Sequence, residues 1–203
     1  MFRLSIMLVS GLALAFSVSP ARALDLNPLT AIKSAIEAVV EDRSAEDIAK
    51  DTEIKAKIVV DVIDKMGADV ISISADVYEQ EVMLSGVVET GAQRAQADQL
   101  TRNIEGVKKL YNEIMVKSDL EEEKGAVENF VDDTVIETKI NAQLLDAKGV
   151  NVTNFVYRSV GGHVFLFGRA LSAEEKDKAT DIARDIKGVV SVKNLAKVKP
   201  LED

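Results

Sequence analysis

One internal repeat limits what this chain can fold into more than any other feature. Gly168 lies 82 positions after Gly86, and Gly188 lies 82 positions after Gly106. The same register holds without a gap over about sixty residues, so it predicts one domain written twice. The matched pairs include Val82/Val164, Leu84/Leu166, Ala97/Ala179, Ile104/Ile186, Val107/Val189, Asp51/Asp133, Thr52/Thr134, Ile54/Ile136, Lys57/Lys139, Ile58/Ile140 and Asn112/Asn194.

Each copy has the periodicity of a helix, two strands, a second helix and a third strand. In the first copy a helix is expected from Ser44 to Met66, strands over 69–77 and 81–88, and a third strand over 107–117. Thr90 and Ser172 are placed to cap the second helix of each copy. A strand–helix–strand connection usually gives parallel strands in one sheet. The sequence therefore predicts the α+β class: two tandem αββαβ domains, each a small three-stranded sheet with two helices on one face.

The segments outside the two copies are predicted to be a signal peptide, a helical lead-in and a linker. Residues 1–23 combine Arg3, a short apolar run and an Ala-Arg-Ala site, which is typical of a cleaved secretory signal peptide. Residues 24–45 form a lead-in in which a helix is expected over 28–42. The first domain then spans 46–118, an acidic linker 119–129 and the second domain 130–200.

Composition argues against several classes of protein. The chain has 203 residues, one His and no Cys, so disulfides and thiolate chemistry are excluded. A net charge of −9 argues against a dedicated nucleic-acid binder. We find no nucleophile elbow, P-loop or dinucleotide-binding glycine pattern. The sequence therefore predicts a protein that is not an enzyme, with no cofactor and no metal.

The charge is distributed unevenly between the copies. Residues 24–132 carry 12 basic and 24 acidic side chains, whereas residues 133–203 carry 11 and 10. The second copy is thus much less acidic than the first, and it is the better candidate for contact with an anionic surface.

The sheet face turned away from the helices gives a second clue. If Val164 and Leu166 face the helices, then Phe165 and Phe167 face the other way, because side chains alternate along a strand. Such an apolar ridge usually marks an interface. It could pack against the other copy or the 28–42 helix, or it could contact a lipid or a partner protein.

The repeated motifs resemble the BON-domain family. The residues that carry this resemblance are Val82-x-Leu84-x-Gly86-x-Val88, Ile104-Glu105-Gly106-Val107 and Tyr111-Asn112, which recur as Val164-x-Leu166-x-Gly168, Ile186-Lys187-Gly188-Val189 and Lys193-Asn194. Asp-Thr-x-Ile-x-x-Lys-Ile at 51–58 and 133–140 also fits the first helix of that family. The resemblance implies an αββαβ fold, a periplasmic location, phospholipid binding, a role in envelope integrity or osmotic-stress tolerance, and no enzymatic activity.

Two functions from different classes follow as expectations. The first is reversible contact with anionic phospholipid through the first helix of the second copy; the candidate residues are Phe130, Val131, Val135, Lys139 and Lys148. The second is an adaptor that docks another envelope protein through the sheet face around Phe167 or through the 28–42 helix. No nucleic-acid partner is expected.

Overall fold

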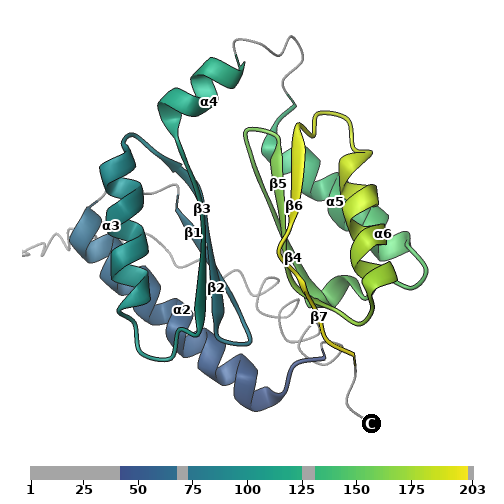
Figure 1. The fold of residues 1–203 in the computed structure, drawn as a ribbon, viewed down its shortest axis with the longest axis horizontal. Helices are drawn as coiled ribbons and strands as arrows, with labels where there is room; N and C mark the ends of the chain where they lie inside the picture. The colour runs from purple at the N-terminus through teal and green to yellow at the C-terminus, as the bar shows by residue number, and fades with distance from the viewer. Residues whose placement is uncertain (1–41, 68–72, 125–130, 201–203) are drawn as a thin grey trace, which may run out of the picture. The chain divides into compact units, whose positions relative to one another are not determined.

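The first repeat folds as the periodicity predicts. The computed structural model describes residues 42–67, 73–124 and 131–200, so the proposed signal peptide, nearly all of the 28–42 helix and Phe130 lie outside the described residues. The elements of the first repeat are α2 (Ala45–Met66), β1 (Ser74–Tyr78), β2 (Glu81–Val88), α3 (Gly91–Arg102) and β3 (Lys109–Val116). The strand order is β1-β2-β3, with β1 antiparallel and β3 parallel to β2. Figure 1 shows α2 and α3 on the same face of this sheet.

The second repeat has the same topology with one difference. Its elements are α5 (Asp133–Asp146), the 3₁₀ turn η2 (Val152–Asn154), β4 (Phe155–Val160), β5 (His163–Ala170), α6 (Ala173–Arg184), β6 (Ser191–Asn194) and β7 (Lys197–Val198). The third strand was expected as one continuous element, equivalent to 107–117 of the first copy, but it is interrupted between β6 and β7. Both pieces pair in parallel with β5. The helices α5 and α6 lie on one face of the second sheet (Figure 1).

A repeated aspartate explains why the hairpin turns are alike in shape although their residues differ. Glu79 and Gln80 have φ angles of 49° and 63°, which are uncommon outside glycine. The amides of both residues donate to the Asp51 carboxylate at 2.7 Å. In the second repeat Gly161 and Gly162 donate in the same way to Asp133 at 2.7 and 2.9 Å. The carboxylate on the first helix of each repeat therefore fixes the turn even where glycine is absent.

The matched asparagines are structural. The Asn112 side chain donates to the Arg94 carbonyl, and its oxygen accepts from the Ile114 amide. Asn194 makes the equivalent bonds to the Lys176 carbonyl and from the Ala196 amide. Each asparagine thus ties the third strand to the second helix of its own repeat.

Each repeat has its own apolar core. The first is built around Ile54, Ile58, Val82 and Leu84, and the second around Ile136, Ile140, Val164 and Leu166. Gly168 allows a close approach in the second repeat, because a Cβ there would lie 2.2 Å from the Asn154 carbonyl oxygen. Two compact αββαβ cores of this kind confirm the predicted fold class.

A third buried cluster contains residues of both repeats, which belong to one compact unit spanning residues 37–203. Its members are Tyr78, Met83, Leu120, Val160, Phe165 and Phe167. Leu120 comes from α4 (Lys117–Lys124), a helix that overlaps the segment expected to be linker. Leu120 is 5% exposed and lies close to Gly161, where an added Cβ would be 2.5 Å from its Cδ2 atom. The start of this acidic segment is thus packed rather than solvated.

Candidate functional site

The helix α5 presents an apolar and basic surface to solvent. Asp132 caps it by accepting from the Thr134 amide, and Ile136, Ile140 and Leu144 bury the opposite side in the core. This four-residue spacing turns Val135, Lys139 and Leu145 outward. Val135 is 44% exposed and Leu145 71% exposed. We define the α5 outer face as Val135, Lys139, Leu145 and the adjacent Lys148.

The two lysines of the α5 outer face are available for an external anion. Within the described residues, no carboxylate lies within 4 Å of either Nζ atom, in contrast to several other lysines of the chain. Lys50, Lys57 and Lys65 on α2 each pair with an acid four residues earlier. Asp146 is an exposed acid on the same side of α5 and offsets part of the positive charge. The face therefore combines two large apolar side chains with two cations that pair with no acid in the part of the chain that the structure describes.

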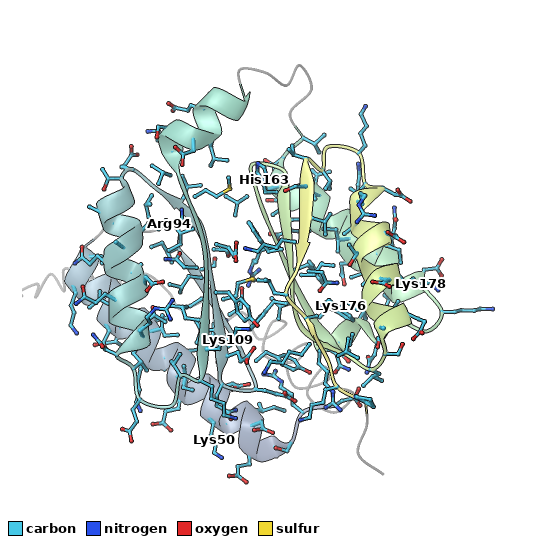
Figure 2. The ribbon with its side chains drawn as sticks, viewed as in Figure 1. Lys50, Arg94, Lys109, His163, Lys176 and Lys178 are labelled. Atoms are coloured by element: carbon cyan, nitrogen blue, oxygen red, sulfur yellow. The ribbon has the colours of Figure 1, made fainter. Side chains whose placement is uncertain are left out.

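Sequence reasoning missed one member of this face, and it did not place a cation of α6 beside it. Leu144 and Leu145 are adjacent apolar residues, so the sequence does not show at once which of them is buried. The four-residue spacing of Ile136, Ile140 and Leu144 assigns Leu144 to the core and leaves Leu145 exposed. Lys178 lies on α6, and its amino group donates to the Lys148 carbonyl, which places a further cation beside the end of α5. Figure 2 shows Lys176 and Lys178 on the same helix. Helical spacing could have found Leu145, but only tertiary structure brings Lys178 to this place.

The other predicted contact residues lie elsewhere. Val131 is partly buried against the second core, and a Cβ at Gly188 would approach its Cβ to 2.4 Å. Phe167 is 2% exposed, and its ring packs edge-on against Tyr111 with 5.8 Å between centroids. Phe165 is 6% exposed. Of the alternatives open for the ridge of Phe165 and Phe167, packing against the other copy is therefore the one found, because both rings are covered by the other repeat.

Contact between the repeats also accounts for part of the charge asymmetry. The acids Asp76, Glu79, Glu81 and Glu113 of the first repeat pair with cations of the second. Those cations are Arg158, Arg169, Lys193, Lys197 and Lys199. Five of the basic residues that make the second copy less acidic are thus internal partners. The other basic side chains of the second repeat, which could meet an outside anion, lie on α5, α6 and the loops beside them.

His163, at the start of β5, is half-buried, and its Nδ1 lies 2.8 Å from the Ser191 hydroxyl. Among the described residues, no group of three or more His, Asp or Glu side chains is arranged to hold a metal ion. None of the described helices combines the length and the apolar character needed to cross a bilayer.

The family model for the BON domain matches residues 50–118 and again residues 132–200. The chain belongs to the BON-domain family. Its two BON domains coincide with the two repeats, so α2 to β3 form the first domain and α5 to β7 the second.

Several proteins resemble the whole tandem. Osmotically-inducible protein Y of Escherichia coli (strain K12) is 31% identical over 73% of this chain and 73% of its own length. The 21 kDa hemolysin of Actinobacillus pleuropneumoniae is 29% identical over 82% and 76% of the two chains. Outer membrane lipoprotein DolP of Haemophilus influenzae is 27% identical over 71% of this chain and 65% of its own. The likeness therefore extends across both BON domains.

Proposed function

We propose that this protein is a non-enzymatic, periplasmic binding protein that touches anionic phospholipid reversibly through the α5 outer face. The observation that carries the proposal is the pairing of two exposed apolar side chains, Val135 and Leu145, with two lysines that have no acidic partner among the described residues. A helix that exposes apolar and basic side chains on one side can lie against an anionic membrane, with the apolar side chains at the headgroup boundary.

The strength of such contact is limited by the size of the face. Each lysine near an anionic surface contributes about 1 kcal/mol at low salt. Leu145 and Val135 add the free energy of moving their exposed apolar surface out of water, about 25 cal/mol per Å². The acidic first domain opposes binding unless it points away from the membrane. These terms favour weak, salt-sensitive attachment rather than permanent anchoring.

The relatives support a place in the cell envelope. One is named an outer membrane lipoprotein and another an osmotically inducible protein. Together with the signal peptide expected over residues 1–23, they favour a periplasmic protein that supports envelope integrity or osmotic-stress tolerance. Unlike a lipoprotein, this chain has no Cys to carry a lipid.

Flotation of the mature chain with vesicles containing an anionic phospholipid tests the proposal. We expect binding at low salt. We also expect a loss of affinity of about tenfold or more in the double variant Lys139→Glu/Lys148→Glu. The matched control is Lys57→Glu/Lys65→Glu on α2, which changes net charge equally and should leave affinity within about twofold. Leu145→Ser should weaken binding with no change in charge.

Two results would overturn the proposal: no flotation at low salt, or equal losses in the α5 and α2 variants. The alternative function, an adaptor that docks an envelope protein, loses one of its two proposed surfaces, because Phe165 and Phe167 on the sheet face are buried. The other proposed surface, the 28–42 helix, lies almost wholly outside the described residues. A protein partner could still use α5. Photo-crosslinking from position 145 in cells distinguishes the two, since discrete protein adducts without lipid adducts would favour the adaptor.

A further inference from the structure

The contact between the two BON domains joins equivalent positions with opposite charge. Asp76 on β1 and Arg158 on β4 are 82 positions apart, so they occupy the same place in the two repeats. They form a bidentate ion pair in which Arg158 Nε and Nη2 each lie 2.7 Å from an Asp76 carboxylate oxygen. The Asp76 side chain is 5% exposed and that of Arg158 34%.

The residues behind this pair are inverted as well. Lys55 on α2 lies 3.7 Å from Asp76, and its equivalent on α5 is Glu137. Glu137 accepts from the Ser159 amide and acts electrostatically on Arg158. The four side chains Lys55, Asp76, Arg158 and Glu137 thus form a row in which every charge in one domain has the opposite sign in the other. We call this set the charge quartet.

Inversion of this kind determines which faces can pair. If two first domains met through this face, Asp76 would face Asp76, and two second domains would bring Arg158 against Arg158. A buried charge without its partner is strongly unfavourable. Like charges across an interface also suppress wrong partners. The apolar residues of the third cluster, by contrast, would tolerate any of these pairings.

The core of each domain is independent of the contact between the domains. The first and second cores each consist of residues from one repeat, whereas only the third cluster draws on both. Contacts between domains of a single chain commonly permit relative motion unless they are large and hydrophobic.

We propose that the charge quartet is the specificity determinant that closes the first BON domain onto the second, and that this closure is reversible. Partner choice lies in the opposed charges that the quartet places at equivalent positions of the two domains. The other four ion pairs between the domains join non-equivalent positions, and the apolar cluster supplies attraction without selectivity. The face fits a BON domain of opposite charge, which in this chain is its own second copy. When the contact opens, Met83, Tyr111 and Phe167 become accessible.

Distance measurements between spin labels on the mature chain test this directly. Because the native chain has no Cys, Ala56→Cys on α2 and Gln143→Cys on α5 supply two exposed labelling sites, one in each domain. With the native quartet we expect one narrow distance distribution. Arg158→Asp places two acids face to face, so the distribution should broaden and shift to longer distances. Lys50→Glu, at an exposed pair with Glu46 that lies within α2, is the matched control and should change it little.

Restoring the quartet gives the sharper result. The double variant Asp76→Arg/Arg158→Asp repairs the central pair. It leaves the introduced arginine beside Lys55 and the introduced aspartate beside Glu137, so recovery should be partial. Adding Lys55→Glu and Glu137→Lys inverts the whole row and should restore the narrow distribution. Far-UV circular dichroism confirms that each variant is folded, and Arg158→Gln replaces Arg158→Asp if the latter unfolds.

Two outcomes would overturn the proposal. One is a narrow native distance in folded Arg158→Asp or Arg158→Gln. The other is a fully inverted variant as open as the single one.

Discussion

The two BON domains share one scaffold but use equivalent surfaces for different purposes. On α2 the lysines at 50, 57 and 65 pair with acids of the same helix, so its outer side is nearly self-neutralised. On α5 the equivalent of Lys57 is Lys139, and the position equivalent to Glu53, the partner of Lys57, is occupied by Val135. Replacing an acid by a valine removes the internal partner and adds apolar surface in one step. The comparison teaches that divergence of the exposed positions, rather than of the core, separates a structural copy from a candidate binding copy.

Substitutions in the buried cores should lower the stability of the two domains alike, and this is the largest expected effect. Ile58 is 1% exposed and its equivalent Ile140 is fully buried. Ile58→Ala and Ile140→Ala should each lower the free energy of unfolding by about 2–5 kcal/mol, because each leaves a cavity in a separate core. Urea unfolding followed by circular dichroism measures both. A cost below about 1 kcal/mol in one domain would show that its core is not packed as described.

A smaller effect should distinguish the second helices of the two domains. Thr101 on α3 is fully buried, and its hydroxyl has no hydrogen-bond partner within the described parts of the chain. The equivalent residue on α6 is Ala183, which needs none. Thr101→Val keeps the volume and removes the unsatisfied hydroxyl, so it should stabilise the chain by about 1 kcal/mol. Thermal or urea unfolding provides the test, with Thr138→Val at an exposed helical position as the control. Destabilisation by Thr101→Val would contradict the unsatisfied state of the hydroxyl.

The smallest effect concerns Glu137, which occupies the position equivalent to Lys55, and it depends on pH. Burial is the main cause that raises the pKa of the Glu137 carboxyl, while the Ser159 amide and Arg158 act in the opposite direction. A raised pKa in the folded state means that ionisation of Glu137 disfavours folding. The chain therefore loses stability as pH rises through the folded-state pKa of Glu137. Below the unfolded-state pKa of about 4.3 the carboxyl is protonated in both states, and this loss is absent.

Glu137→Gln should accordingly be slightly more stable than the native chain at neutral pH and equal to it in acid. Unfolding curves over a pH series measure the difference. Glu53→Gln is a suitable contrast, since pairing with Lys57 lowers the pKa of Glu53 and reverses the sign of the pH dependence. A Glu137→Gln difference that grows toward acid pH would contradict this assignment.

Local signals in the sequence predicted most of the scaffold correctly. The helix from Ala45 to Met66, the caps at Thr90 and Ser172, and the parallel third strands all appear where periodicity and capping residues placed them. Each of these depends on neighbours within a few residues or on the chain's own repetition. The outward direction of Val135 and Lys139 also follows from helical spacing, so the core of the candidate site was predictable.

Other features required the tertiary structure because their causes lie far away in the chain. Asp76 alternates along β1 with the core residue Val77, and its own side of the strand is buried because Arg158 of the other domain pairs with it. Phe167 was a candidate for surface contact and instead packs on Tyr111. Alternation along a strand says which side chains share a face, but it cannot say what covers that face.

The sequence by itself therefore determined the repeat, the family and the fold of each domain, since these rest on periodicity and matched residues. Only the tertiary structure decided which of the second domain's cations are internal. It assigned five of them to acids of the first domain and left Lys139 and Lys148 facing outward. The physical reason is that an ion pair depends on the distance between two charged groups in space, and their separation along the chain does not set that distance.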